Sequence, residues 1–347
     1  MSKNNVMIMA GGTGGHVIPA LSVAKELKLK GYNVHWLGSI KGIENDLVPD
    51  AGYTLHRISV TGLRGNGLLK TLLAPLQILR ALWQTFKVYR QVKPVMALGM
   101  GGFASGPGGL MAYLLRVPLV IHEQNAVPGM TNSILSKLAE EKQAKSVGNP
   151  VRQSIAAISE PMQRLAERDD HLNVLVVGGS LGAVGINNVV IEAMGLDASQ
   201  IHVWHQTGKR NYDAVKAGYE AGGIQDVKVS DFIADMAKAY EWADVVVCRS
   251  GALTVSEMMA AGVAAILVPF PFAVDDHQTA NGQFLVSAGA AKIIPQAQLN
   301  AKNLLEELHH LRTHREVLLE MSKAARSLAK PDSAKVVAKY CIEAINV

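Results

Sequence analysis

The stretch Val6-Met7-Ile8-Met9-Ala10-Gly11-Gly12-Thr13-Gly14-Gly15 sets an apolar run of strand length directly before a cluster of glycines. The arrangement returns in the second half of the chain as Val176-Val177-Gly178-Gly179-Ser180-Leu181-Gly182. A buried strand that ends in a glycine-rich turn and leads into a helix is typical of doubly wound parallel sheets. The repetition therefore predicts two such domains, which also suits a length of 347 residues.

Short apolar runs with helical segments between them extend this pattern in both directions. We expect strands at 6–10, 34–38, 54–58, 95–99 and 118–121, and again at 173–177, 201–205, 227–230, 245–248, 264–268 and 292–294. Helical apolar spacing predicts three final helices at 300–313, 315–328 and 333–345. The expected fold class is α/β, with two Rossmann-like, doubly wound parallel-sheet domains that face each other across a cleft.

The boundary between the two domains is expected where Gly148-Asn149-Pro150 opens a polar, charged run. We place the first domain at 1–148, the second at 149–330, and a last helix at 331–347 that packs back on the first. A cleft between two such domains is a natural place for a ligand.

Composition narrows the range of partners. The formal charge of +5 favours anionic partners, but no basic block with interleaved aromatic residues is present, which argues against nucleic acid. The two cysteines, Cys248 and Cys341, have no metal-binding spacing and fit a reducing compartment. The uncharged stretch 94–115 contains six glycines and two prolines, so we expect no membrane span there.

The first glycine cluster leads directly to His16. Its backbone N–H groups can approach an anion at the start of a helix that we expect near Pro19. Both the order of a dinucleotide fingerprint and the Gly-Lys-Ser/Thr of a P-loop are absent. Imidazole is the usual group for taking a proton from a hydroxyl nucleophile, so His16 is the expected catalytic base. The alternative is a purely structural tight turn.

A second glycine-rich strand exit, at 99–109, offers another anion site in the same half. Two such sites in one domain suggest an acceptor that carries a diphosphate, although packing alone could account for the glycines. Four polar residues, His122-Glu123-Gln124-Asn125, follow the fifth strand and are expected near the substrate. The expected acceptor contacts are Gly101, Gly102, Ser105, Gly106 and Glu123.

In the second half, residues 249–257 follow a buried strand and open a helix whose free N–H groups suit a phosphate. Glu257 can accept two hydroxyl hydrogen bonds from a ribose, although a solvated acid near the start of a helix is the alternative. Residues 275–281 place acids, an amide and an imidazole before another helix, a mixture that suits a hydroxyl-rich ligand. Asp275 and Asp276 could instead cap that helix, whereas Gln278 is harder to explain by capping.

Taken together, these segments resemble the MurG family of N-acetylglucosaminyltransferases, which complete the lipid-linked disaccharide-peptide precursor of peptidoglycan. The matching motifs are GGTGGH at 11–16, LGMGGFASGPGG at 98–109, HEQN at 122–125, VGNPVR at 147–152, VVGGS at 176–180, VVVCRSGALTVSE at 245–257 and DDHQTAN at 275–281. The resemblance implies the GT-B architecture and an inverting transfer that forms a β-1,4 bond. The C-terminal domain would bind UDP-N-acetylglucosamine, and the N-terminal domain would bind the undecaprenyl-linked acceptor, lipid I.

The resemblance also implies roles for single residues. Arg152 and Ser180 would contact the donor phosphates, and Ile233 would offer its backbone to uracil. Glu257 would hold the ribose, and Gln278 would bind the sugar hydroxyls. The other implied donor contacts are Thr13, Gly14, Gly15, Asn125, Arg249, Ala252, Leu253, Thr254, Val255, Ser256 and His277. No cofactor and no obligatory metal are implied, because a helix N-terminus can stabilise departing UDP.

The chain departs from the family pattern in two places. Between Asn132 and Val147 it lacks roughly nine residues, which form a sixth strand and its loop in the family. The structure of the expected linker region is therefore undecided by the sequence. Leu181 stands where the family usually has glutamine, so a polar contact at that position is in doubt.

A polyprenyl-linked acceptor implies a surface that faces a membrane. The apolar stretch 68–83, with Lys70, Arg80, Lys87 and Arg90 nearby, predicts an amphipathic helix on an anionic membrane. The expected membrane contacts are Leu72, Leu76, Leu79 and Trp83. A long helix packed on its own sheet would have a similar sequence. The resemblance further implies a peripheral enzyme on the cytoplasmic face of the bacterial inner membrane, with cell-wall synthesis proteins as candidate partners.

Two other functions fit part of the pattern. A UDP-N-acetylglucosamine 2-epimerase shares the architecture and the nucleotide, but it needs carboxylates for proton removal at the sugar. A non-enzymatic protein that binds lipid precursors would keep the cleft without the chemistry.

Overall fold

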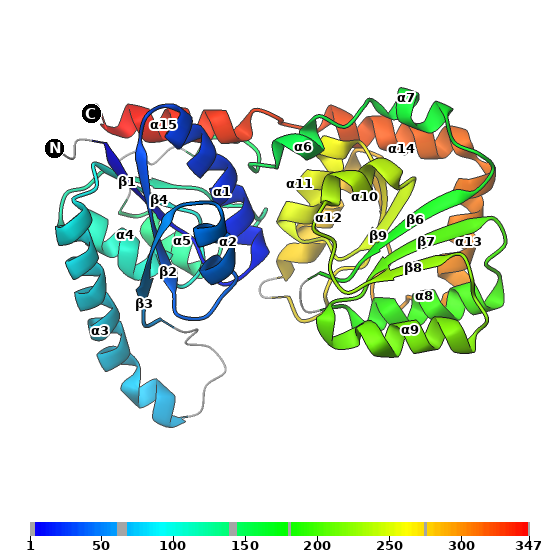
Figure 1. Cartoon of the computed structure of the whole chain (residues 1–347), viewed down its shortest axis with the longest axis horizontal. Helices are drawn as coiled ribbons and strands as arrows, with labels where there is room; N and C mark the ends of the chain where they lie inside the picture. The colour runs from blue at the N-terminus through cyan, green and yellow to red at the C-terminus, as the bar shows by residue number, and fades with distance from the viewer. Residues whose placement is uncertain (1–3, 61–67, 139–143, 180–181, 274–275, 346–347) are drawn as a thin grey trace. The chain divides into compact units, whose positions relative to one another are not determined.

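The computed structural model describes residues 4–60, 68–138, 144–179, 182–273 and 276–345, with the backbone alone for 68–74. The predicted contact at Ser180, the departure at Leu181, the expected cap at Asp275 and the side chain of Leu72 lie outside the described part. The chain forms two compact units (Figure 1). The N-terminal domain consists of Met1–Arg152 and Lys330–Val347, and the C-terminal domain consists of Gln153–Ala329.

The N-terminal domain contains a parallel five-stranded sheet in the order β3-β2-β1-β4-β5. Its strands are β1 (Asn5–Met9), β2 (Asn33–Ser39), β3 (Thr54–Ile58), β4 (Met96–Gly99) and β5 (Leu119–Ile121). Its helices are α1 (Gly14–Leu29), α2 (Glu44–Asp50), α3 (Leu68–Val92), α4 (Ser105–Leu114), α5 (Met130–Leu135) and α15 (Ser333–Ile345). The strand order reverses between β1 and β4, and ligands of doubly wound sheets bind beyond the carboxyl ends of strands at such a point.

Helices cover both faces of this sheet. One core cluster joins the strands to α1, α2 and α15 through residues such as Val23, Val48 and Cys341. The other joins them to α3 and α4 through residues such as Tyr89 and Met111. Because both faces are covered, the central strands are buried and their sequences are continuously apolar.

The C-terminal domain contains a parallel six-stranded sheet in the order β11-β10-β9-β6-β7-β8. Its strands are β6 (Leu172–Val177), β7 (Ile201–Gln206), β8 (Val227–Ser230), β9 (Val245–Cys248), β10 (Ala264–Leu267) and β11 (Ala291–Ile293). Its helices are α6 (Gln153–Ala156), α7 (Pro161–Ala166), α8 (Val184–Leu196), η1 (Lys209–Asn211), α9 (Tyr212–Ala221), α10 (Met236–Trp242), α11 (Ala252–Ala261), α12 (His277–Ser287), α13 (Ala301–Thr313) and α14 (Arg315–Ser327). Here the strand order reverses between β6 and β9.

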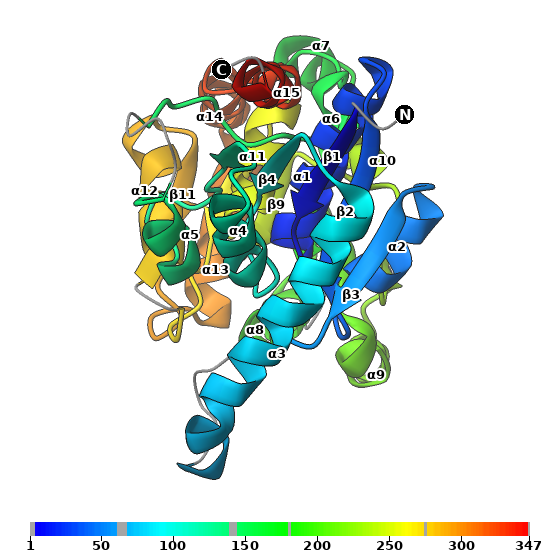
Figure 2. The same cartoon turned by 90° about the vertical axis from the view of Figure 1, so that its left-hand side faces the viewer.

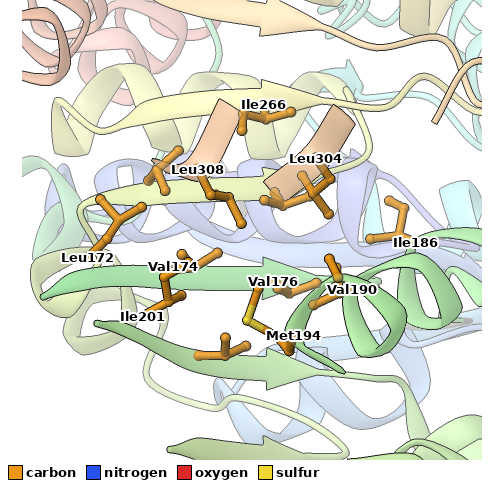
Figure 3. Packing of buried hydrophobic residues seen from close by; sticks show 14 of the residues in the cluster. Leu172, Val174, Val176, Ile186, Val190, Met194, Ile201, Ile266, Leu304 and Leu308 are labelled. Atoms are coloured by element: carbon orange, nitrogen blue, oxygen red, sulfur yellow. The ribbon is translucent and has the colours of Figure 1, made fainter. Parts of the chain in front are cut away.

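One core cluster of this domain lies between the sheet and helices α8, α9, α13 and α14. Figure 3 shows Val174 and Val176 of β6 beside Val190 and Met194 of α8, with Leu304 of α13 above them. On the opposite face, Cys248 Sγ lies 3.9 Å from Met258 Sδ of α11. Both faces of the sheet are therefore buried, and the polar residues lie in the loops that follow its strands.

Every predicted strand is present, and the doubly wound α/β class is confirmed. The expected start of the first helix near Pro19 is wrong, because α1 begins at Gly14. Gly14, Gly15 and His16 therefore belong to the first helical turn and not to a loop before it. Within the described part of the N-terminal domain the sheet has five strands, so the shortened segment after Asn132 adds none there.

Candidate functional site

The turn after β1 is held by a buried carboxylate from α2. Gly12, whose φ is 93°, donates its N–H to Glu44 Oε2 at 2.9 Å. Glu44 is 0% exposed, and its Oε1 accepts from the backbone N–H and the hydroxyl of Ser39 at 2.9 and 2.6 Å. A Cβ at Gly11 would lie 2.5 Å from that same oxygen, so any larger residue would displace the buried carboxylate.

The N-cap of α1 is Thr13, whose backbone is extended. His16 is the third residue of the helix and lies in its first turn. Its Nδ1 is 3.2 Å from Oε1 of Gln124, which follows β5. The ring lies against Gly101, where an added Cβ would be 2.7 Å from Nδ1. The structure thus brings the exits of β1, β4 and β5 together around one partly exposed imidazole.

The second glycine-rich turn packs under the first one. A Cβ at Gly102 would lie 2.3 Å from the carbonyl oxygen of Gly11. Ser105, a predicted acceptor contact, is 0% exposed, and its hydroxyl is 2.8 Å from the carbonyl oxygens of Met9 and Gly101. Its side chain therefore faces the interior and holds the two turns together, and its predicted contact with an acceptor stays a prediction.

Glu123 organises the loop that carries Gln124 and Asn125. Its carboxylate accepts from the N–H groups of Gln124, Asn125 and Gly129 and from the amides of Asn125 and Asn132. Burial alone would raise the pKa of Glu123, but the hydrogen bonds from Asn125, Asn132 and Gly129 lower it overall. Its predicted contact with an acceptor stays a prediction, as do those of Gly101, Gly102 and Gly106, and so does the predicted donor contact of Asn125.

In the C-terminal domain, Gln206 at the end of β7 ties two strand exits together. Its Oε1 accepts from Gly179 N–H at 3.0 Å, and its Nε2 donates to the carbonyl oxygens of Gly179 and Asp231 at 3.2 and 3.1 Å. Asp231 opens the short loop that contains Ile233, the residue expected to meet uracil. Beside this loop, an open pocket of about 380 Å³ is lined by Lys209, Tyr212, Asp213, Val229, Ser230, Asp231 and Phe232.

The exit of β9 leads into α11, with Gly251 as N-cap. Residues 252–254 form its first turn, which is the positive end of the helix dipole. Glu257 lies in the next turn, is 3% exposed, and its Oε2 accepts from the Tyr240 hydroxyl at 3.2 Å. The guanidinium of Arg249 donates to the carbonyl oxygens of Val268 and Pro269, so it braces the loop after β10.

Two hydrogen bonds join the start of α12 to these loops. Ser250 Oγ donates to the carbonyl oxygen of Gln278 at 2.7 Å, and Gln278 Oε1 accepts from Phe270 N–H at 2.9 Å. Gln278 and the N-terminus of α11 are thus neighbours. The donor roles of Ile233, Arg249, Glu257, His277 and Gln278, like those of Arg152 and residues 252–256, stay predictions.

Sequence reasoning missed Glu44, Gln206 and Tyr240, and it gave Gln124 no role of its own. All four are buried and hydrogen-bonded in the structure, but no shared local pattern in the sequence marks them. Across the described residues, no group of three or more histidine, cysteine, aspartate or glutamate side chains is placed to hold a metal ion. In the same residues, no helix combines the length and apolarity needed to cross a bilayer.

Comparison with known proteins gives consistent matches. The chain matches the glycosyltransferase family 28 N-terminal domain over residues 6–142 and the C-terminal domain of that family over 173–337. A protein of Marinobacter nauticus named UDP-N-acetylglucosamine–N-acetylmuramyl-(pentapeptide) pyrophosphoryl-undecaprenol N-acetylglucosamine transferase is 50% identical, with 99% of this chain and 98% of that protein covered. The crystal structure of Acinetobacter baumannii MurG is 41% identical, covers 98% of this chain and 99% of that chain, and gives a TM-score of 0.82. A UDP-GlcNAc 2-epimerase from Neisseria meningitidis, bound to UDP-GlcNAc, covers 98% of this chain and 100% of its own at 12% identity and a TM-score of 0.66, and so shares the fold alone.

Proposed function

Because the chain belongs to the family 28 glycosyltransferases named UDP-N-acetylglucosamine–N-acetylmuramyl-(pentapeptide) pyrophosphoryl-undecaprenol N-acetylglucosamine transferases, we propose how its residues carry out that transfer. The protein is a GT-B N-acetylglucosaminyltransferase. It moves N-acetylglucosamine from UDP-N-acetylglucosamine to lipid I, which gives lipid II. The observation that carries this function is 50% identity over 99% of the chain, since it includes both domains.

In the N-terminal domain, His16 is the proposed base for the C4 hydroxyl of the muramyl sugar. Its support is geometric, because the imidazole lies in the first turn of α1 at the reversal of strand order and is partly exposed. Asn125, Gly101 and Gly106 lie on the neighbouring strand exits and are the proposed substrate contacts.

In the C-terminal domain, the exits of β6, β8 and β9 are the proposed donor site. Gly179 and the first turn of α11 would face the diphosphate, and the backbone of Ile233 would face uracil. Glu257 would accept hydrogen bonds from the ribose, and Gln278 would contact the sugar. The N-terminus of α11 carries partial positive charge, so it would stabilise the negative charge that develops on departing UDP.

The membrane surface is proposed to be the N-terminal part of α3, as far as Trp83. Residues 75–80 are all exposed, whereas Ala81, Thr85 and Tyr89 in the second half are buried against the domain. Leu76 is 65% exposed, Leu79 62% and Trp83 58%, and Lys87 Nζ lies 3.5 Å from the centre of the Trp83 ring. Figure 2 shows this part of α3 extending away from the sheet of its domain. Exposed apolar side chains beside cations suit an anionic lipid surface.

This surface supports a peripheral location on the cytoplasmic face of the bacterial inner membrane. A lipid-linked acceptor stays in the bilayer, so an enzyme that binds it must work at the membrane surface. Cell-wall synthesis proteins that act on the same lipid remain candidate partners.

The function is tested with purified full-length protein, UDP-N-acetylglucosamine and a short-chain lipid I analogue. We expect disaccharide product and UDP in equal amounts, with no free 2-epimer. His16→Ala should lower kcat by about 10²–10⁴-fold, the usual contribution of a general base, with UDP binding retained. Release of the free 2-epimer in place of product would contradict the transferase, and turnover within about tenfold of wild type would contradict the role of His16.

The membrane surface is tested by cosedimentation with phosphatidylglycerol vesicles. Leu76→Ser with Leu79→Ser should release most of the protein into the supernatant, because about 1.5–3 kcal/mol is lost for each apolar side chain withdrawn from lipid. The matched control is Leu29→Ser with Leu196→Ser, two leucines that are 71% and 64% exposed elsewhere. Unchanged sedimentation of the α3 variant, or an equal loss in the control, would contradict the proposal.

A further inference from the structure

We propose that Gln124 is a positioning residue for the transfer, because its amide holds His16 in the tautomer that leaves Nε2 without a proton. Nε2 is then the atom that receives the proton of the attacking hydroxyl. This inference rests on the proposed function, in which His16 is the base, and it concerns residues of the N-terminal domain alone.

The orientation of the Gln124 amide follows from its neighbour on β4. Gln124 Nε2 lies 2.9 Å from the carbonyl oxygen of Met100, and a carbonyl can only accept, so the amide nitrogen must be the atom facing it. Oε1 then faces His16 Nδ1 at 3.2 Å. Because an amide oxygen can only accept, Nδ1 carries the proton. A neutral imidazole has one protonated nitrogen, so the lone pair lies on Nε2.

The amide is fixed by bonds on both sides of the residue. The backbone N–H of Gln124 donates to Glu123 Oε1 at 3.1 Å, and its carbonyl oxygen accepts from Asn149 Nδ2 at 2.9 Å. Met100 is anchored in turn, because its N–H donates to the carbonyl oxygen of Met9 at 2.9 Å. Gln124 is 7% exposed, so water cannot readily replace these partners. Turning the amide over would set Oε1 against the carbonyl oxygen of Met100 and leave a buried acceptor unpaired.

Gly101 lets the imidazole lie close to the chain, because it has no side chain. A Cβ at this position would lie 2.7 Å from His16 Nδ1 and 2.8 Å from Cε1, closer than real side chains approach. The imidazole therefore lies directly on the backbone of the second glycine turn. Among the described residues, Nδ1 is the ring nitrogen that has a hydrogen-bond partner, which leaves Nε2 for a substrate.

A second histidine shows what a purely structural imidazole looks like in this chain. Asn187 Nδ2 donates to the carbonyl oxygen of Thr207 at 3.3 Å, so Asn187 Oδ1 faces His205 Nε2 at 3.1 Å. The Tyr219 hydroxyl is 2.8 Å from Nδ1 of His205 and donates to it. Both nitrogens of His205 are thus engaged, whereas the same kind of amide engages one nitrogen of His16.

With Nε2 unprotonated, His16 can accept the proton that the acceptor hydroxyl loses during the transfer. The C4 oxygen forms a bond to the anomeric carbon, and the bond from that carbon to the β-phosphate oxygen breaks, with its electron pair leaving on UDP. The proton of the C4 hydroxyl moves to Nε2 of His16. The resulting imidazolium keeps its Nδ1–H bond to Gln124, so the ring does not have to turn during the reaction.

The tautomer is tested directly in the full-length protein labelled with ¹⁵N-histidine. Long-range ¹H–¹⁵N spectra of the neutral ring, assigned with His16→Ala, are expected to show a protonated Nδ1 and a bare Nε2. Gln124→Met keeps the length of the side chain without its polar atoms, and it should populate the Nε2–H tautomer. A wild-type ring protonated at Nε2 would overturn the proposal, whatever Gln124→Met does to the fold.

Kinetics test whether Gln124 acts through His16. With the lipid I analogue, Gln124→Met should lower kcat by about 10–10²-fold, less than a whole general base contributes, with the Kd for UDP unchanged. Gln91→Met, at an exposed glutamine, is the control. Added to His16→Ala, Gln124→Met should cause no further loss.

A loss of the same size in the His16→Ala background would show that Gln124 acts apart from His16 and would overturn the proposal. If His16→Ala leaves no measurable turnover, the spectra decide alone. Failure of the wild-type protein to form any disaccharide would instead overturn the proposed function, and the tautomer of His16 would still be read independently.

Discussion

The glycine turns after β1 and β6 are built alike but are held by different chemistry. In each, the first glycine is tightly packed, since a Cβ would lie 2.5 Å from Glu44 at Gly11 and 3.0 Å from the nitrogen of Ala183 at Gly178. In each, the second glycine has a positive φ, 93° at Gly12 and 76° at Gly179, and a Cβ would meet nothing within 4 Å. A side-chain oxygen accepts the N–H of that second glycine in both turns.

The difference lies in the charge of that acceptor. The turn beside His16 is held by the Glu44 carboxylate, and the turn in the proposed donor site is held by the neutral amide of Gln206. A carboxylate close to a diphosphate would repel it, whereas an amide holds the turn without adding negative charge. Two glycine turns with similar backbones thus differ in the charge of the side chain that accepts the second glycine's N–H, Glu44 in one and Gln206 in the other.

The largest effect is expected where the turn after β4 packs on the turn after β1, because a single added methyl group would separate them. Gly102→Ala is expected to destabilise the protein by about 3–5 kcal/mol, because the Cβ would meet Gly11 backbone and φ is positive. Gly12→Ala should cost about 1–2 kcal/mol, since its Cβ meets open space. Urea unfolding measures both. Equal losses would mean that close packing between the turns does not matter.

Exchanging the charge at the donor turn should weaken nucleotide binding. Gln206→Glu is expected to raise the Kd for UDP by about 10²-fold, equivalent to about 2.7 kcal/mol, through repulsion and the lost donor to Asp231. Calorimetry gives the Kd, and Gln225→Glu, at an exposed residue of the same domain, is the control. An unchanged Kd would show that UDP binding does not require a neutral side chain at Gln206.

The reverse exchange in the N-terminal domain should affect folding more than donor binding. Glu44→Gln is expected to lower stability by about 2 kcal/mol, because one amide NH₂ group must then face an N–H of Gly12 or Ser39. The Kd for UDP should stay within twofold. Asp50→Asn, on the exposed side of the same helix, provides the control for thermal melting. A Glu44 variant as stable as the control would contradict this role.

The smallest expected effect concerns His205, next to Gln206. Burial lowers the pKa of His205 to about 3, from 6.5 when unfolded. The unfolded chain therefore binds more protons between these values, so this contribution to stability is complete above pH 6.5 and is lost as pH falls toward 3. Between pH 7.5 and 5.5 the loss should be about 1.4 kcal/mol.

Urea midpoints at those two pH values measure this loss. His205→Gln should remove that part of the pH dependence, whereas His202→Gln, on the same strand and partly exposed, should leave it intact. If both variants keep the wild-type slope, His205 is not the group responsible.

The fold was largely predictable because the buried strands β1, β4 and β6 are apolar runs that lead into glycine-rich turns, and shorter apolar runs mark the other strands. The start of α1 was not predictable. Proline is common in the first turn of a helix and glycine has a low helix propensity, so the sequence favoured a start near Pro19. The helix nevertheless begins at Gly14. The bond between His16 and Gln124 spans 108 residues and depends on the order of the strands. Motifs therefore named candidate residues, whose roles stay predictions, whereas the hydrogen-bond partners of these residues required the structure.

The central claim is that UDP binds at the turn after β6 and not at the turn after β1. Hydrogen exchange of the full-length protein with and without UDP tests this claim most directly. We expect UDP to slow amide exchange at Gly179, at 231–233 and in the first turn of α11, and to leave the amides of 11–16 unchanged. Protection centred on 11–16, with none at Gly179 or α11, would contradict the assignment of the donor to the amide-held turn.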